Sequence, residues 1–150
     1  MSLQEKVMSE MKLAMKAKDT VALESLRAIK SALLLAKTEK GGGSELSEQD
    51  EIKLVQKLVK QRKDSAAIFK EQGRNDLADP ELAQVAVLEK FLPEQLSEEE
   101  IEKVVVQTIA AIGASGMQDM GKVMGMVSKA LAGQADGKTI SMVVKKKLSS

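Results

Sequence analysis

The chain of 150 residues contains no cysteine and no histidine. Without cysteine it has no disulfide framework, no thiol nucleophile and no thiolate metal site. Without histidine it lacks the usual general base near pH 7 and the commonest zinc ligand. These absences exclude zinc-finger sites and Ser-His or Cys-His catalysis, and we expect no metal and no other cofactor.

Aromatic residues are almost as scarce, since tryptophan and tyrosine are missing and only Phe69 and Phe91 remain. Proteins that bind unpaired bases stack them on aromatic rings, so this class of binder is excluded. The longest apolar run, Ala32 to Ala36, is far too short to span a membrane. The amino terminus lacks the apolar core of a signal peptide. We therefore expect a soluble, cytoplasmic protein without membrane contact.

Only two prolines interrupt the chain, and no useful stretch alternates with the period of a strand. Apolar residues recur instead at helical spacing, which predicts an all-α fold. Leu92-Pro93 is the expected domain boundary, because the residue before proline is disfavoured in a helix and a new pattern begins at Ser97. The prediction is an amino-terminal domain of about four helices (1–92) and a small three-helix domain (93–150).

Local signals predict the ends of the helices in the first domain. The first helix should cover about residues 2–18, and Asp19 should cap a second helix that is nearly apolar all round and hence the most buried. Gly41–Gly43 should end that helix and form a flexible connection to Ser44. The third helix should run from Ser47 to Gln72, with Gly73 as its left-handed stop. Asp79-Pro80 should open the fourth.

Two charged residues lie on predicted apolar stripes. Arg62 falls in the middle of the inward stripe of the third helix, and Glu89 falls on that of the fourth. Because an unpaired buried charge is costly, we hypothesise that Arg62 and Glu89 form a buried ion pair, joined by Arg27. The alternative is that the Arg62 side chain extends past its neighbours to solvent.

In the second domain, Ser97 with Glu100 predicts a capping box, and the helix that it opens should stop at Gly113. Ser115 with Gln118 should cap the next helix. Positive charge accumulates here, because from Glu102 onward there are 7 basic and 3 acidic residues. This excess suits a polyanionic partner.

Gly121 and Gly125 lie four residues apart inside a predicted helix, where each costs up to ~1 kcal/mol relative to alanine. Close packing of a neighbouring helix is the commoner explanation of such spacing. The other explanation is the close approach of a ligand backbone, with Lys122, Lys129 and Lys138 nearby to receive an anion. The triplet Lys145–Lys147 fits equally well with anion binding and with the dipole of the final helix.

Three segments carry a resemblance to a known family. They are Phe91-Leu-Pro-Glu-Gln-Leu-Ser-Glu-Glu-Glu-Ile101, Asp119-Met-Gly-Lys-Val-Met-Gly125 and Ala135-Asp-Gly137. With them the chain resembles the GatB/YqeY family over its whole length. Members of this size are similar to the helical tail of the B subunit of the glutamine-dependent aspartyl/glutamyl-tRNA amidotransferase, and to an appendage of some glutaminyl-tRNA synthetases. In those proteins the tail binds the outer corner of folded tRNA.

The resemblance implies that this chain is a tRNA-binding module, with an amidotransferase or an aminoacyl-tRNA synthetase as a further partner. It places the RNA-facing surface around Asp119, Gly121, Lys122 and Gly125, with Asp136, Gly137 and Lys138 beside it. The basic residues Lys129 and Lys145–Lys147 complete the expected RNA-binding set. Glycines and lysines of this kind recognise phosphates and shape, which requires no aromatic stacking.

Two other functions stay open. One is an enzyme, a carbon-nitrogen ligase that uses glutamine as its amide donor, since carboxylates and lysines can do acid-base chemistry. We predict no catalytic residue for it, because the sequence offers no Ser/Gly-rich amidase segment. The other is a protein-interaction module in which the two helical halves bracket a partner and the basic patch is incidental.

Overall fold

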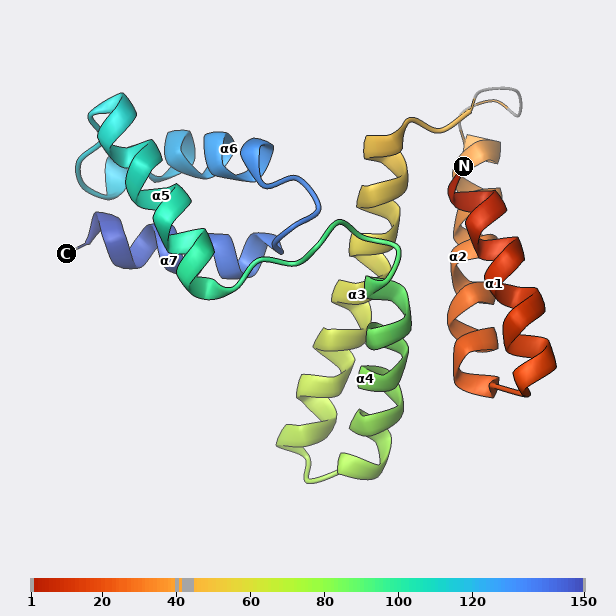
Figure 1. The fold of residues 1–150 in the computed structure, drawn as a ribbon. Coiled ribbons are helices and arrows are strands. Elements are labelled where there is room, and N and C mark those ends of the chain that lie inside the picture. The colour runs from red at the N-terminus through yellow and green to blue at the C-terminus, as the bar shows by residue number, and fades with distance from the viewer. Residues whose placement is uncertain (1, 40, 42–44, 150) are drawn as a thin grey trace. The chain divides into compact units, whose positions relative to one another are not determined.

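The computed structural model describes residues 2–39, 41 and 45–149. In this part of the chain the protein is all α, as predicted, and no strand is present. No helix in the described ranges has the length and apolar character needed to cross a bilayer. The elements in chain order are α1 (Leu3–Ala17), α2 (Thr20–Glu39), α3 (Glu48–Glu71), α4 (Asn75–Glu89), α5 (Glu98–Ile112), the 3-10 turn η1 (Met117–Asp119), α6 (Met120–Ala130) and α7 (Gly137–Leu148) (Figure 1).

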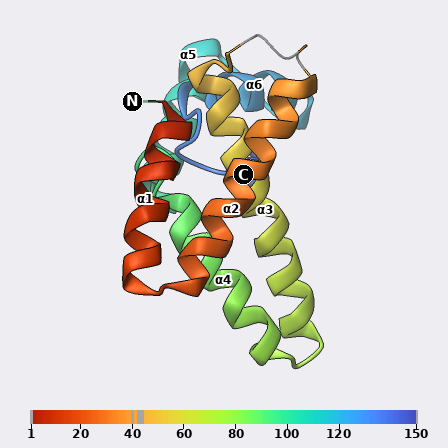
Figure 2. The same ribbon diagram turned by 90° about the vertical axis from the view of Figure 1, so that its right-hand side faces the viewer.

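The described residues divide at Leu92–Pro93 into two compact units, α1–α4 in unit 1 and α5–α7 in unit 2. Within unit 1, α2 packs against α1, α3 and α4, and Figure 2 shows it running between α1 and α3. The unit 1 core draws on all four helices, and its fully buried side chains include Leu26, Ile29, Val55 and Leu88.

Side-chain caps fix most helix starts in unit 1. Asp19 Oδ1 accepts a hydrogen bond from the Ala22 amide at 3.1 Å, so the predicted cap of α2 is confirmed. Ser47 and Asp50 form a reciprocal capping box at α3, and Gly73 ends that helix with φ +71°. The predicted glycine-serine connection falls largely on residues 42–44, which lie outside the described ranges.

The prediction that α2 is the central and most buried helix is confirmed, because it packs against α1, α3 and α4 and has four buried residues in the described part of the chain, where each of these helices has three. Its inward face carries Leu26, Ile29 and Leu33, but Leu34 and Leu35 are 57% and 63% exposed. The three neighbouring helices therefore do not cover α2 on every side. An apolar sequence on all sides thus accompanies a central position here without requiring burial on all sides.

The predicted start of α4 at Pro80 is wrong, because the helix begins at Asn75 and contains the proline. The Arg74 guanidinium binds the Asp76 carboxylate with two hydrogen bonds of 3.0 and 2.9 Å. Ala78 is fully buried. Its burial fixes a helical turn ahead of the proline, and this packing outweighs the local preference for proline at a helix start.

Arg62 and Glu89 have separate partners, which corrects the predicted pair. Arg62 Nε donates to Gln84 Oε1 at 2.7 Å, and Arg62 Nη1 donates to the Leu58 carbonyl at 3.1 Å. Glu89 forms its ion pair with Lys63, at 3.3 Å, and Arg27 is exposed. The Gln84 side-chain amide and the Leu58 carbonyl accept the hydrogen bonds of the Arg62 guanidinium. The Glu89 carboxylate is therefore left near the solvent.

In unit 2 the capping box of Ser97 with Glu100 is confirmed, and Gly113 ends α5 with φ +64°. The core packs α5, α6 and α7 together, and its fully buried side chains include Val105, Val123, Val127 and Val144. Ser115 and Gln118 do not cap α6. Instead, Asp119 Oδ2 accepts a hydrogen bond from the Ser115 amide at 2.8 Å, which closes the turn before the helix.

Candidate nucleic-acid interface

Gly121 and Gly125 lie on the exposed side of α6, opposite the buried Val123 and Val127. An added Cβ at either glycine meets no heavy atom within 4 Å in the described part of the chain. Close helix packing is therefore the wrong explanation of this glycine pair. The bare backbone faces open space.

Lys122 and Lys129 lie beside the glycines on the same side of α6 and are exposed. At 100° per residue, these two lysines and the two glycines fall within about 100° of the helix circumference. We call the surface formed by Gly121, Lys122, Gly125 and Lys129 the α6 face. A ligand could approach the backbone of α6 closely beside two cations, and this arrangement suits a sugar-phosphate backbone.

The start of α7 differs from the α6 face, although Gly137 and Lys138 are exposed there. Asp136 caps the helix, with Oδ1 accepting a hydrogen bond from the Thr139 amide at 2.6 Å. A carboxylate thus occupies this helix start and stabilises it. It also opposes an incoming phosphate, so the resemblance-based placement of the RNA at Asp136 lacks electrostatic support.

The three lysines at the end of α7 are not equivalent. Lys145 and Lys146 are exposed, whereas Lys147 forms an ion pair with Glu102 of α5 at 2.5 Å. The Lys147 hydrogen bond is the largest cause of the lowered pKa of Glu102, followed by the charges of Lys147 and Lys146. Lys147 therefore joins α5 to α7 and contributes less to an open cationic surface than its neighbours.

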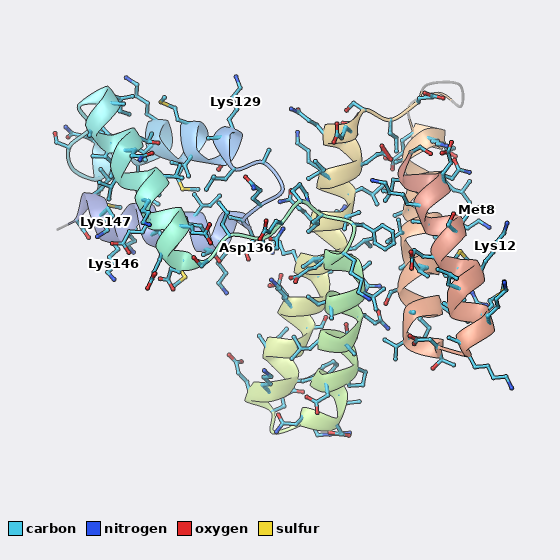
Figure 3. The ribbon with its side chains drawn as sticks, in the orientation of Figure 1. Met8, Lys12, Lys129, Asp136, Lys146 and Lys147 are labelled. Atoms are coloured by element: carbon cyan, nitrogen blue, oxygen red, sulfur yellow. The ribbon has the colours of Figure 1, made fainter. Side chains whose placement is uncertain are left out.

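The predicted RNA-binding residues form two surfaces. Figure 3 shows Lys129 pointing away from α7, whereas Lys146 leaves the unit on the opposite side in this view. Lys138, Lys145 and Lys146 belong to α7, and we call them the α7 lysines. The α6 face combines two lysines with two open glycines, whereas at α7 a single open glycine, Gly137, precedes Lys138 at a helix start that the Asp136 carboxylate caps.

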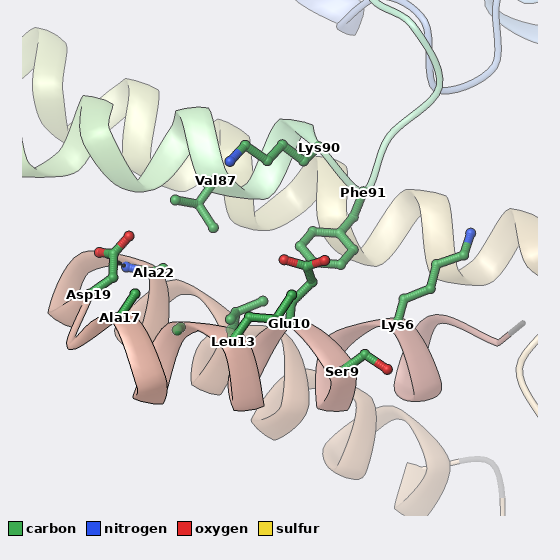
Figure 4. A pocket seen from close by; sticks show the side chains of 12 residues that line it. Lys6, Ser9, Glu10, Leu13, Ala17, Asp19, Ala22, Val87, Lys90 and Phe91 are labelled. Carbon is green, nitrogen blue, oxygen red and sulfur yellow. Dashed lines mark hydrogen bonds between the residues drawn. The ribbon is translucent and has the colours of Figure 1, made fainter.

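Unit 1 offers a separate hollow of about 590 Å³ between α1 and α4, drawn in Figure 4. Lys6, Ser9 and Glu10 line its α1 side, and Val87 and Phe91 line its α4 side. Among the described side chains, no hydrogen bond joins Ser9 to Lys6 or to Glu10. Nucleophilic catalysis uses a hydroxyl bonded to its base, and this hollow does not display that arrangement.

The described residues contain no group of three or more Asp and Glu side chains placed to hold a metal ion.

Two hydrogen bonds within unit 2 were not predicted from the sequence. Gln95 Nε2 donates to the Gly133 carbonyl at 2.7 Å, and the Leu96 amide donates to the Gln134 carbonyl at 2.9 Å. These bonds tie the segment before α5 to the connection between α6 and α7. A polar residue before a capping box gives no sequence signal of such a distant acceptor.

Comparison with known proteins identifies similar chains. A family model described as Yqey-like protein matches residues 4–148. The chain is 36% identical over 103 residues to a component of the glutamyl-tRNA(Gln) amidotransferase of Thermococcus gammatolerans, a match that covers 66% of this chain and 16% of that relative. The chain thus spans about a sixth of the length of the amidotransferase component.

Two further relatives are both named altered inheritance of mitochondria protein 41, mitochondrial. The protein of Pyrenophora tritici-repentis is 29% identical over 132 residues, covering 87% of this chain and 71% of the relative. The protein of Clavispora lusitaniae is 34% identical over 109 residues, covering 71% and 62%. These matches extend across much more of the relatives than does the match to the amidotransferase component.

Proposed function

The chain belongs to the Yqey-like protein family, and from this premise we propose that it is a tRNA-binding module whose α6 face contacts the sugar-phosphate backbone of folded tRNA. Contact through backbone approach and lysines recognises shape and phosphate, so bases need not be unstacked. The module is not catalytic in this proposal.

The observation that carries the proposal is the open space above Gly121 and Gly125. Each glycine weakens α6 by up to ~1 kcal/mol relative to alanine, and no packing contact within the described chain offsets that cost. A ligand that needs the bare backbone supplies a reason for the glycines. The exposed Lys122 and Lys129 beside them make an anionic ligand the best match.

The relatives support tRNA as the anion. The Thermococcus gammatolerans protein is named for glutamyl-tRNA(Gln), and its similarity to this chain is confined to a small part of its length. We propose that this part carries the tRNA-binding property and that an amidotransferase or a synthetase is the setting in which this chain works. The cytoplasmic location stays a prediction, because two relatives are named as mitochondrial.

The test is a salt titration of full-length protein with folded bulk tRNA. One variant carries Lys122→Gln and Lys129→Gln, and its matched control carries Lys138→Gln and Lys145→Gln, so both lose two charges. We expect the α6 variant to lose affinity and to lower the log-log salt slope by about 2. The α7 control should change less, because phosphates beyond roughly 8–10 Å are screened.

Equal losses in the two variants would contradict the proposal, since they would indicate attraction by charge without a located site. Absence of tRNA binding by the parent at low salt would also contradict it.

A further inference from the structure

The first two helices of unit 1 meet along a well-defined edge. A short turn at residues 18–19 joins α1 to α2, and the two helices lie side by side (Figure 2). Gln4 Oε1 of α1 accepts a hydrogen bond from Lys37 Nζ of α2 at 2.7 Å, which marks the edges where the helices meet. At 100° per residue, Met8 and Met15 lie within about 40° of Gln4 on α1. These two methionines therefore follow the edge of α1 that borders α2.

The bordering edge of α2 carries both charged and apolar side chains. Arg27, Lys30 and Leu34 lie within about 80° of Lys37 on the circumference of α2. Leu34 is 57% exposed, and the two methionines of α1 are 44% and 55% exposed. These apolar side chains therefore project from the unit 1 core toward solvent.

Lys12 completes this surface. It is exposed and lies about 40° from Met8, and Figure 3 shows both side chains leaving α1 on the side away from α3. We call the surface formed by six residues the hairpin face: Met8, Lys12, Met15, Arg27, Lys30 and Leu34. It combines three apolar side chains with three cations.

The cations of the hairpin face are uncompensated. Among the described residues, Lys12, Arg27 and Lys30 take part in no ion pair and in no side-chain hydrogen bond. All three are exposed. A second copy of this chain would set the same cations against them, so like charges oppose a homodimer through this face.

The carboxylates nearest to these cations along the two helices face α4 instead. Glu10 lines the hollow between α1 and α4, where Figure 4 shows it. Glu24 Oε2 accepts a hydrogen bond from Gln84 Nε2 of α4 at 3.2 Å. The positive and negative charges of α1 and α2 are thus separated onto different sides, and the hairpin face is cationic.

We propose that the hairpin face docks an acidic amphipathic α-helix of a partner protein, with its apolar stripe on the methionines and Leu34 and its carboxylates beside the three cations. Charge complementarity selects the sign of this partner. A helix that lies along two neighbouring helices packs its side chains between theirs, and apolar anchors at helical spacing are a recurring mode of recognition. Methionine suits such a contact, because its flexible and polarisable side chain adapts to the partner.

Two other anionic partners fit this face less well. Phosphates of an RNA would neutralise the cations but leave the methionines and Leu34 in water. An anionic bilayer presents an extended plane of charge, and near the start of α1 this plane would meet Glu5 and Glu45, which are exposed and line a hollow there. A helix of about three turns covers the hairpin face without extending over these carboxylates. This proposal concerns unit 1 and does not depend on tRNA binding by the α6 face.

The experiment measures binding of two designed helical peptides to the full-length protein by fluorescence anisotropy. Both peptides carry leucines at i, i+3, i+4 and i+7, and they differ only in having glutamates or lysines on their flanks. We expect the acidic peptide to bind about tenfold more tightly, which corresponds to two or three modest ion pairs.

A double charge reversal on α2, Arg27→Glu with Lys30→Glu, tests the electrostatic part. Its matched control on α3 is Lys53→Glu with Lys57→Glu, since both pairs are exposed cations about one helical turn apart. The α2 variant should lose the preference for the acidic peptide, and the α3 variant should keep it.

Leu34→Ser tests the apolar part, and Leu35→Ser is its matched control. Leu35 is the adjacent leucine, similarly exposed at 63%, and lines a hollow between α2 and α3. Leu34→Ser should weaken binding of the acidic peptide about fivefold or more, and Leu35→Ser should not. Circular dichroism and urea unfolding check that each variant remains folded.

Failure of both peptides to bind, an unchanged preference in the α2 variant, or equal effects of the two serine substitutions would each overturn the proposal. So would sedimentation that shows a dimer dissociated by Leu34→Ser, because a second copy would then occupy the face. Vesicles of phosphatidylcholine with and without phosphatidylserine test the lipid alternative. Binding to the anionic vesicles, or to tRNA, that is lost in the α2 variant while the parent binds no peptide would assign the face to a membrane or to RNA instead.

Discussion

Lys147 Nζ of α7 lies 2.5 Å from Glu102 Oε1 of α5, and this ion pair joins the end of the last helix to the first half of α5. The Lys147 ammonium lowers the pKa of Glu102, mainly through the hydrogen bond and then through its charge. Lys147, which the sequence assigns to an RNA-binding triplet, is thus held in an ion pair within unit 2.

The first prediction concerns the pH dependence of this pair. Because the folded pKa of Glu102 is lowered, its stabilising contribution is fully present above the ordinary glutamate pKa. It is lost as pH falls through that value toward the folded one. In a double-mutant cycle of Glu102→Gln with Lys147→Ala, urea unfolding should show coupling at pH 7 that decreases as the pH is lowered below the ordinary glutamate pKa. The control cycle with Lys145→Ala should show little coupling throughout this pH range.

The second prediction separates Arg62 from Glu89. Arg62→Met removes the hydrogen bonds to Gln84 and to the Leu58 carbonyl, and should lower the free energy of unfolding by about 1 kcal/mol. Glu89→Gln should change it by less than about 0.5 kcal/mol, because the side chains of the Lys63–Glu89 pair are 42% and 33% exposed. If urea denaturation showed equal losses of unfolding free energy in the two variants, the result would support the buried Arg62–Glu89 pair predicted from the sequence.

The third prediction concerns the proline inside α4. Pro80 is the sixth residue of the helix and cannot donate to the Asp76 carbonyl one turn earlier. Pro80→Ala should therefore raise the free energy of unfolding by ~1–3 kcal/mol, whereas Glu81→Ala next to it should have a much smaller effect. A lower free energy of unfolding in Pro80→Ala would show instead that the helix begins at the proline, where proline is favourable.

Local chemistry made part of the fold predictable. Ser47 with Asp50, and Ser97 with Glu100, form caps from residues three apart, so no distant contact had to be known. The start of α4 could not be predicted in this way, because burial of Ala78 against the rest of unit 1 decides it. Tertiary packing overrides a local preference at such a position.

The candidate site was likewise only partly predictable from the sequence. The sequence places Gly121 and Gly125 in a helix, but whether they face a neighbour or open space depends on how α5, α6 and α7 pack. Spacing alone favoured a packing role, and the structure leaves both glycines bare. The sequence likewise gives no sign that Lys147 pairs with Glu102, because these residues are far apart in the chain and meet only in the fold.

The most direct test of the account changes Gly121 and Gly125 together to alanine and measures both urea unfolding and tRNA affinity. Because an added Cβ meets open space at each site, the variant should be more stable, by up to ~1 kcal/mol for each substitution. Its affinity for folded tRNA should nevertheless fall about tenfold or more, because the methyl groups keep the RNA backbone away from α6. Met126→Ala, at an exposed position about 100° or more around the helix from both glycines, should leave tRNA binding unchanged. Lower stability, or undiminished tRNA binding, in the double alanine variant would contradict the account.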